Sequence, residues 1–401
     1  MSGKAHMIVG DAREIPVPDG FFHCAVTSPP YWGLRDYGHA GQLGLEPTPE
    51  QYVANMVEVC REARRVLRDD GTLWLNLGDC YQNAKGQAGG VDPKQPARRH
   101  GLRPNDRSIP GLKPKDLVGI PWRVAFALQA DGWWLRDCIV WDKPNAMPSS
   151  VTDRTTTSHE YVFLLAKARR YFYDADAIRE PITSTGGACF GKQNISADGT
   201  KSQSRKLTDA SERNNPLGRN KRSVWRVTTN AFAGAHFATF PPRLIEPCIK
   251  AGTSEHGCCP ACGAPWRRVV EKSREFGSGS GRAGNMPVGK NGANMQGGGA
   301  TLDIRRGPLV STFTTGWQPT CKCPDAEPVP CRVLDMFGGA GTTPMVAARL
   351  GRIGYGIERK HDYAVMARDR CADDAANPLK LKRPKRPKPV PRGQAELFPA
   401  A

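Results

Sequence analysis

A strand, a helix and a second strand near the amino terminus constrain the fold of this chain more than any other feature. Residues 21–26 and 72–77 are short, mostly apolar runs, which is typical of buried strands. Between them, residues 50–67 carry apolar side chains at helical spacing, and we expect the Asp-Asp-Gly at 69–71 to end that helix. The order strand, helix, strand predicts a βαβ unit and therefore a parallel sheet with a right-handed crossover.

A glycine loop in the second half of the chain predicts a ligand site at the end of another strand. Residues 333–336 are predicted to form a strand, the next five are Phe-Gly-Gly-Ala-Gly, and a helix is predicted over 342–350. Glycines let backbone amides approach a ligand closely where a helix begins. Asp335 at the strand end can accept from an amino group, and Glu358, at the end of the next predicted strand, suits ribose hydroxyls. The loop by itself also fits a nucleotide-binding fold.

The turn that follows the strand at 21–26 predicts a second site. Its sequence is Thr-Ser-Pro-Pro-Tyr-Trp, and neither proline can donate a backbone hydrogen bond, so strand and helix both stop there. The Ser28 hydroxyl and the carbonyls of Ser28 and Pro29 are then unpaired acceptors, which suit a substrate that presents an amino group. Tyr31 and Trp32 offer flat faces on which a base can stack. The alternative is a proline-stiffened turn packed by aromatic side chains.

The Ser-Pro-Pro-Tyr sequence after a hydrophobic strand resembles the catalytic motif of the DNA amino-methyltransferases, and the longer run over 27–38 resembles site-specific enzymes of phage and bacterial origin. The resemblance implies transfer of a methyl group from S-adenosylmethionine to the exocyclic nitrogen of cytosine or adenine, after the base is flipped out of duplex DNA. It implies catalytic roles for Ser28, Pro29, Pro30 and Tyr31. Ser in the first position is typical of the cytosine-N4 group, whereas adenine enzymes usually carry Asp or Asn there.

The glycine loop carries the same resemblance. Its pattern Asp-x-Phe-x-Gly-x-Gly resembles the S-adenosylmethionine loop of these enzymes, and the catalytic turn precedes the cofactor loop, as in their β-type motif order. The implied fold is a Rossmann-like α/β sheet, mostly parallel and circularly permuted. A Gly-Asp after a short strand at 7–10 is expected near the adenine ring, although an Asp there also suits a turn. The expected cofactor-binding residues are Asp11, Asp335, Phe337, Gly338, Gly339, Gly341, Thr342, Thr343 and Glu358.

Several segments between the predicted core elements are basic, polar or rich in glycine. The formal net charge of +18 predicts a polyanionic partner such as DNA, although part of the excess lies in the tail. We therefore divide the chain into a discontinuous methyltransferase domain, 1–376, and a disordered basic tail, 377–401. The domain is interrupted by a flexible basic insertion at 83–116, a candidate target-recognition insertion at 183–223 and a cysteine-rich insertion at 254–330.

The cysteine-rich insertion predicts a structural metal site. Cys259 and Cys262 form a Cys-x-x-Cys-Gly knuckle, and Cys321 and Cys323 follow as a second pair. Four thiolates suit tetrahedral Zn²⁺ and leave no open position for catalysis. The alternatives are free or redox-sensitive thiols, and the adjacent Cys258 could replace Cys259 as a ligand. We expect the glycine-rich stretch between the pairs to be a disordered loop whose ends the metal would hold together.

The segment 142–181 also resembles a shared block of the family. We interpret His159 and Glu160, at the start of a predicted strand, as a structural pair, and Lys143 as a candidate phosphate contact. A helix that starts at the Pro-Pro of 241–242 is expected beside the methionine end of the cofactor.

These features together predict a site-specific, S-adenosylmethionine-dependent DNA methyltransferase acting on N4 of cytosine. The alternatives are an adenine-N6 methyltransferase of the same fold and a catalytically inactive, zinc-containing DNA-binding protein. We expect double-stranded DNA as a partner, and a restriction endonuclease is a candidate partner whose presence the sequence does not determine. The sequence has no apolar run of about eighteen residues and no signal-peptide core, so we expect no membrane span and a cytoplasmic protein in a bacterial or phage-infected cell.

Overall fold

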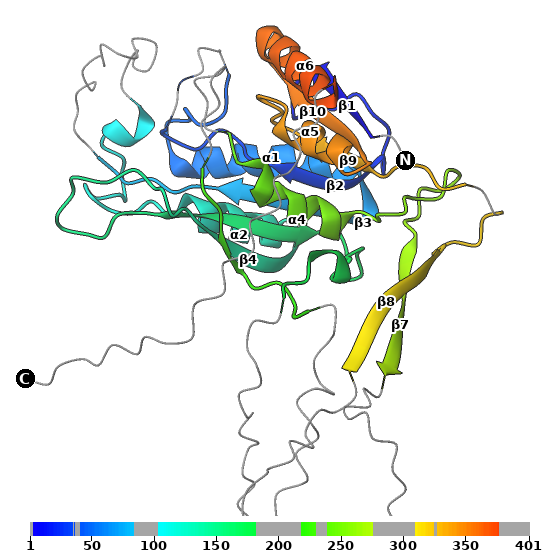
Figure 1. Cartoon of the computed structure of the whole chain (residues 1–401). Helices are drawn as coiled ribbons and strands as arrows, with labels where there is room; N and C mark the ends of the chain where they lie inside the picture. The colour runs from blue at the N-terminus through cyan, green and yellow to red at the C-terminus, as the bar shows by residue number, and fades with distance from the viewer. Residues whose placement is uncertain are drawn as a thin grey trace, which may run out of the picture.

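A mostly parallel, eight-stranded sheet forms the core of the computed structural model, which describes residues 3–34, 36, 41–83, 103–181, 218–229, 239–275, 309–324 and 327–376. Its strands are β1 (Lys4–Val9), β2 (Phe22–Thr27), β3 (Leu67–Leu77), β4 (Trp134–Asp142), β5 (His159–Ala166), β6 (Val224–Arg226), β9 (Arg332–Asp335) and β10 (Ile353–Glu358). They lie in the order β1-β10-β9-β2-β3-β5-β4-β6 (Figure 1). Neighbours pair in parallel except around β5, which runs antiparallel to both β3 and β4. The predicted α/β class is confirmed.

Helices cover both faces of this sheet. They are α1 (Pro49–Val66), α2 (Ile120–Ala130), α4 (Pro242–Gly252), α5 (Thr342–Arg349) and α6 (His361–Ala376), with short 3-10 turns at Pro104–Asp106 and Asp176–Ile178. On one face, Met56 of α1 and Val124 of α2 share a buried cluster with strand residues. On the other, Ile249 of α4 and Val346 of α5 lie in a second cluster with Val26 of β2. The fold is therefore a three-layer sandwich with the sheet in the middle (Figure 1).

Helix α1 begins as its sequence predicts but ends earlier. The Thr48 side chain accepts a hydrogen bond from the Gln51 backbone amide, and a proline occupies the first helical position. The helix stops at Val66, because Leu67 already adopts extended angles and pairs with Phe22 of β2. The prediction that residues 69–71 end the helix is therefore wrong: they lie inside β3, where sheet pairing has replaced the expected turn.

The connections on the two sides of β2 and β9 create a crevice at one edge of the sheet. β2 is followed by α1 on one face, whereas the neighbouring strand β9 is followed by α5 on the opposite face. In an open α/β sheet, ligands bind beyond the carboxyl ends of the strands at such a reversal. The Thr27 hydroxyl at the end of β2 donates to the Asp335 carboxylate at the end of β9, 2.7 Å away. This edge is therefore where the fold predicts a ligand.

The predicted insertions lie only partly within the described residues. In the cysteine-rich insertion, β7 (Arg267–Glu275) and β8 (Leu309–Gln318) form an antiparallel ribbon that extends away from the central sheet (Figure 1). Residues 84–102, 182–217, 276–308 and 377–401, which include most of the two basic insertions, the predicted glycine-rich loop and the tail, lie outside the described residues. No helix in the described part of the chain has the length and apolar character needed to cross a membrane.

The close contact between β10 and α5 gives a test of the packing. A β-carbon on Gly354 would lie 2.4 Å from the Pro344 Cα, and backbone cannot yield as a flexible side chain can. We expect Gly354→Ala to push the helix off the strand and to lower the free energy of unfolding by about 1–3 kcal/mol, measured by urea denaturation. Gly316→Ala in β8 is the control, because a β-carbon there meets nothing within 4 Å among the described atoms. Equal losses in the two variants would contradict this packing.

Candidate functional site

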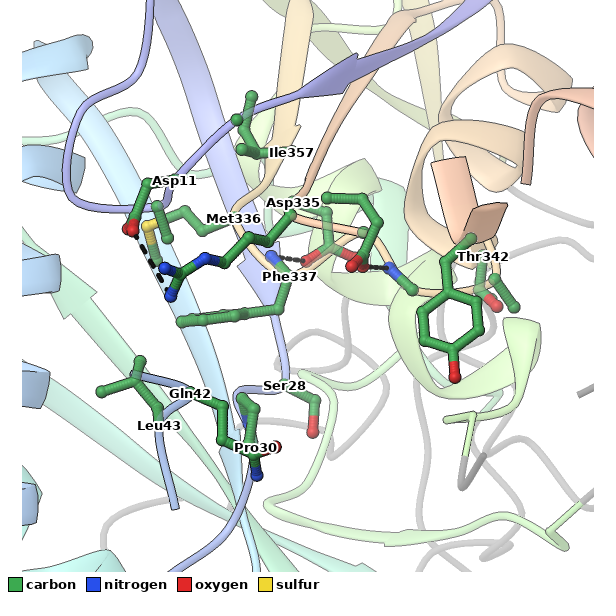
Figure 2. Close-up of a pocket in the computed structure, with 18 of the residues that line it drawn as sticks. Asp11, Ser28, Pro30, Gln42, Leu43, Asp335, Met336, Phe337, Thr342 and Ile357 are labelled. Atoms are coloured by element: carbon green, nitrogen blue, oxygen red, sulfur yellow. Dashed lines mark hydrogen bonds and ion pairs between the residues drawn. The ribbon is translucent and has the colours of Figure 1, made fainter. Parts of the chain in front are cut away.

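A cavity at the carboxyl edge of the sheet brings the two predicted motifs together. Ser28 and Pro30 line it from the turn after β2, while Gly339 and Thr342 line it from the loop after β9. Figure 2 shows Ser28 and Pro30 on one side in this view and Asp11, Met336 and Ile357 on the other, with the Phe337 side chain between them. The other predicted residues on its wall are Asp11, Asp335, Phe337, Gly338 and Glu358, joined by Arg13, Gln42, Leu43, Thr239, Phe240, Arg359 and Tyr363 among others.

The glycine loop is shaped by backbone conformation and by its contact with β10. Gly339 and Gly341 have φ of 48° and 72°, in the left-handed region that suits glycine. The Gly339 amide donates to the Glu358 carboxylate at 3.0 Å, which ties the loop to the end of the neighbouring strand. A β-carbon on Gly338 would lie 2.8 Å from the Met7 methyl group and 3.2 Å from the Gly356 backbone. The loop can follow this path only with glycine at these positions.

Asp335 is a buried carboxyl group at the junction of the two motifs. Its side chain is 1% exposed and accepts hydrogen bonds from the Thr27 hydroxyl and, at 3.1 Å, from the Phe337 amide. Burial raises the pKa of this carboxyl to about 6, partly offset by those hydrogen bonds. Asp335 therefore offers acceptor oxygens at the cavity wall and gains from any cation that binds beside it.

Some predicted residues lie beside the cavity without lining it. The Thr343 hydroxyl donates to the Val26 carbonyl at 3.1 Å, inside the core, and so fastens α5 to β2. Gly341 faces α6, where a β-carbon would lie 3.1 Å from the Ala367 side chain. Pro29 and Tyr31 are also not among the residues that line the cavity. The segment just before α4, which is expected beside the methionine end of the cofactor, lines the cavity at Thr239 and Phe240.

A polar cluster lies behind the Ser28 hydroxyl. The Tyr31 hydroxyl is 3.1 Å from the Ser28 oxygen and donates to a Glu160 carboxylate oxygen at 2.8 Å. The Asn76 amide nitrogen lies 2.6 Å from the Tyr31 oxygen, 3.0 Å from Glu160 and 3.2 Å from Ser28. The Lys143 ammonium pairs with the other Glu160 oxygen. Glu160 is therefore the common acceptor of the cluster, with its charge balanced by lysine.

The cluster sets the direction of the Ser28 hydroxyl proton. An ionised carboxylate can only accept, so the Tyr31 proton must point to Glu160. Burial and the nearby Glu160 charge hold the pKa of Tyr31 well above its ordinary value, so the phenol keeps that proton. The Tyr31 oxygen accepts from the Asn76 amide and can accept from the Ser28 hydroxyl as well. Because the Ser28 oxygen also accepts from the Asn76 amide, one of its two lone pairs remains to accept a hydrogen bond from a ligand in the cavity.

Two interpretations from the sequence are wrong at this site. Trp32 is fully buried and its indole nitrogen donates to the Glu46 carbonyl at 2.9 Å, so it has no face free to stack on a base. Glu160 does not pair with His159, whose ring nitrogen lies 3.2 Å from the Tyr161 hydroxyl. Glu160 reaches Ser28 because β5 starts where β3 ends, in an antiparallel pair. The sequence could have predicted Asn76 as a site residue, because it lies near the end of β3, the strand that follows β2 in the predicted βαβ unit. The sequence could not have predicted the direction of β5.

The four predicted metal-ligating cysteines also come together. The sulfur atoms of Cys259, Cys262, Cys321 and Cys323 all lie within 4.8 Å of one another, at the base of the β7–β8 ribbon. His23, Cys258 and Cys331 form a second close group beside them.

Known proteins similar to this chain are DNA methylases. The profile of the N6/N4 family, described as DNA methylase, matches residues 22–259, which include the turn at Ser28. The Type II methyltransferase M.Cfr9I of Citrobacter freundii is 49% identical over 62% of this chain and 73% of that protein. The Type II methyltransferase M.XycI of Xanthomonas campestris pv. cyanopsidis is 50% identical over 61% of this chain and 71% of that protein. Among solved structures, PvuII DNA methyltransferase (cytosine-N4-specific) is similar at 14% identity and a TM-score of 0.47, with 94% of this chain and 95% of that chain covered.

The buried carboxyl group of Asp335 predicts a pH-dependent stability. Because its folded pKa of about 6 exceeds its ordinary value of 3.8, the stabilisation by the neutral form is complete below about pH 4 and lost as pH rises through 6. Asp335→Asn keeps an oxygen that can accept from Thr27 and Phe337. We expect this variant to gain stability over wild type between pH 4 and 7, reaching about 3 kcal/mol.

Urea denaturation at a series of pH values measures this difference. Asp153→Asn is the control, since that carboxylate is exposed and its pKa is lowered by Lys115. A flat difference between Asp335→Asn and wild type from pH 4 to 7 would show that burial does not control this group.

Proposed function

Because the chain belongs to the N6/N4 family of DNA methylases and is a DNA methyltransferase, we propose that it transfers a methyl group from S-adenosylmethionine to the exocyclic N4 of cytosine in duplex DNA. The observation that carries the proposal is that Ser28 and the glycine loop line the same cavity. An acceptor for the target amino group and a cradle for the methyl donor therefore face one another. We also propose that the chain has the circularly permuted, β-type motif order, in which the catalytic turn precedes the cofactor loop.

The residues of the cavity fit S-adenosylmethionine. A β-carbon on Gly339 would meet only the Phe337 carbonyl, at 3.7 Å, so the glycine leaves space that a side chain would fill. Asp335 offers a carboxylate to the ammonium group of the ligand. Glu358, which already accepts from the Gly339 and Lys360 amides, keeps lone pairs for ribose hydroxyls. Asp11, paired with Arg359 at 3.8 Å, is assigned to the adenine end. When bound, the ligand supplies an electrophilic methyl group.

The proposed role of Ser28 is to orient the nitrogen that receives the methyl group. Its oxygen and the Pro29 carbonyl accept the two amino hydrogens, which turns the nitrogen lone pair toward the cavity. The base must be flipped out of the duplex, and the Tyr31 ring, fixed by its hydroxyl, is the surface assigned to stack on it. Proline at position 30 limits the turn to this path. The acceptor is nitrogen, so no cysteine nucleophile is needed and catalysis is mainly positioning.

Serine in the first motif position supports cytosine over adenine as the target. Its resemblance is to the cytosine-N4 group, and its hydroxyl can donate to Tyr31, whose own proton goes to Glu160, while its oxygen still accepts from an amino group. Methylation of adenine N6 is the alternative that the same cavity would permit.

The proposal includes three further assignments. The positive net charge of +18 supports double-stranded DNA as the partner, and the Type II names of the relatives support a cognate restriction endonuclease. The methyltransferase and the endonuclease would both act on DNA in the cytoplasm of a bacterial or phage-infected cell. The four clustered cysteines are assigned to a structural zinc ion, which takes no part in methyl transfer because four thiolates leave no open position.

The product of the reaction tests this proposal directly. Nucleosides from duplex DNA treated with the protein and S-adenosylmethionine are separated and weighed by mass spectrometry, and we expect N4-methylcytosine. Ser28→Ala should lower kcat about 100-fold, as removal of one aligned hydrogen-bonding group at a reacting centre does. Ser254→Ala is the control, because the hydroxyl of this buried serine has no partner among the described residues. If N6-methyladenine were the only methylated product, the target base would be adenine and not cytosine. If no methyl group were transferred, the result would favour an inactive DNA-binding protein.

The role of Glu160 as a positioning residue can be separated from a purely structural one. Glu160→Gln removes the ionised acceptor, so the Tyr31 and Ser28 protons lose their fixed direction; we expect kcat to fall roughly 10-fold, or about 1.4 kcal/mol, with little change in KM for the cofactor. Tyr31→Phe should have an effect that does not add to that of Glu160→Gln, because both break the same relay. Additive effects of the two substitutions on kcat, or a change in KM alone, would rule out this chain of hydrogen bonds from Ser28 through Tyr31 to Glu160.

A further inference from the structure

The four cysteines flank the base of the β7–β8 ribbon. Cys259 and Cys262 precede β7, Cys321 and Cys323 follow β8, and the ribbon begins where Arg267 pairs with Gln318. The antiparallel pairing brings both cysteine pairs to one place, with all sulfur atoms within 4.8 Å of one another. A compact set of four sulfur ligands is the donor set that suits tetrahedral Zn²⁺.

The neighbouring group of His23, Cys258 and Cys331 does not compete for the metal. The Nδ1 atom of His23 accepts from the Arg332 backbone amide at 3.1 Å, and its Nε2 atom lies 2.9 Å from the Gly263 carbonyl. Both ring nitrogens are therefore engaged. The Cys258 thiol donates to the Val329 carbonyl at 3.5 Å, and its backbone pairs with the same residue. Cys258 thus faces away from the four-sulfur group, which leaves Cys259 as the ligand.

The knuckle is tied directly to the central sheet by the carbonyl groups next to its cysteines. The Arg68 guanidinium of β3 donates to the Cys262 carbonyl at 2.7 Å, and His23 of β2 reaches the next carbonyl, that of Gly263. Within the knuckle, the Gly263 amide donates to the Cys259 carbonyl at 2.8 Å. The backbone conformation of the knuckle that brings its cysteine sulfur atoms together therefore also directs its carbonyl groups to β2 and β3.

The ribbon has a second attachment at its first residues. Arg268 of β7 forms a salt bridge with Asp174 at 3.1 Å and another with Glu255 at 2.6 Å. The same guanidinium lies 4.4 Å from the Trp317 ring of β8, and that ring stacks on His256. These contacts bind both strands at the ribbon base, in addition to the contacts made by the knuckle.

We propose that one Zn²⁺ ion, bound by Cys259, Cys262, Cys321 and Cys323, is a clasp that closes the base of the β7–β8 ribbon and fixes it to the amino-terminal edge of the central sheet. His23 lies near the start of β2, whereas Ser28 follows its end. Five residue steps from His23 to Ser28 separate the two sites by about 17 Å. Zinc therefore stabilises the ribbon without contact with the catalytic cavity, and its binding releases protons from the thiols.

The experiment measures metal content and ligand type in the purified full-length protein. We expect one zinc per chain by elemental mass spectrometry, and a zinc X-ray absorption spectrum with only sulfur neighbours at about 2.3 Å. Cys259→Ser and Cys323→Ser should lose at least nine-tenths of the metal. Cys258→Ser, one residue away, is the matched control and should keep it. Zinc-free wild-type protein, nitrogen or oxygen neighbours in the spectrum, or equal zinc loss in Cys258→Ser and Cys259→Ser would overturn the proposal.

A second measurement does not depend on how well the cysteine variants fold. Chelation of zinc from the native protein should speed limited proteolysis within the ribbon at least several-fold, while the far-ultraviolet circular dichroism of the α/β core stays near that of the untreated protein. Unchanged proteolysis after complete zinc removal would mean that the metal does not hold the ribbon. These outcomes are independent of methyl transfer, so a failure of the proposed reaction and a failure of the zinc clasp can be told apart.

Discussion

The hydrogen bond between the Thr27 hydroxyl and the Asp335 carboxylate is the contact on which the rest of the site depends. It joins residues 308 positions apart at the carboxyl ends of two neighbouring strands. β2 and β9 pair at Cys24 with Val333 and at Ala25 with Leu334, and the crevice lies beyond this ladder. Because the helices that follow the two strands leave on opposite faces, the crevice is not filled by a crossover. The turn with Ser28 and the glycine loop meet there, each held by its own strand.

The chemistry of the site is set by groups that lie behind the cavity. A serine hydroxyl can donate or accept, and its partner decides which. The Glu160 carboxylate, balanced by Lys143, can only accept, so it orients Tyr31 and through it Ser28. Asp335 is in the opposite situation, since burial raises its pKa to about 6 and no cationic side chain among the described residues pairs with it. Glu160 thus has Lys143 as its ionic partner, whereas Asp335 gains stability when a cation binds beside it.

The two ends of β2 and β9 carry different kinds of site. At their carboxyl ends lie the cavity and its polar cluster. At their amino ends, the His23 ring accepts from the Arg332 backbone amide and contacts the Gly263 carbonyl, next to Cys262. The parallel pairing of β2 and β9 permits this separation, because the two strands point the same way and their amino and carboxyl ends therefore lie at opposite edges of the sheet. A metal site at one edge can hold an appendage in place without altering the geometry at the other.

The sequence alone determined the α/β class, the main strands and helices, the two motifs and the four clustered cysteines, because hydrophobic periodicity, glycine and proline positions and cysteine spacing are local signals. It could not determine that Trp32 is buried, that α1 passes directly into β3, or that Glu160 and Lys143 complete the cluster at Ser28. Those facts depend on strand direction and on which segments pair: β5 runs antiparallel to β3, and this brings the start of one strand to the end of another. Pairing between distant strands is decided by burial and hydrogen bonding over the whole sheet, and no local stretch of sequence encodes it.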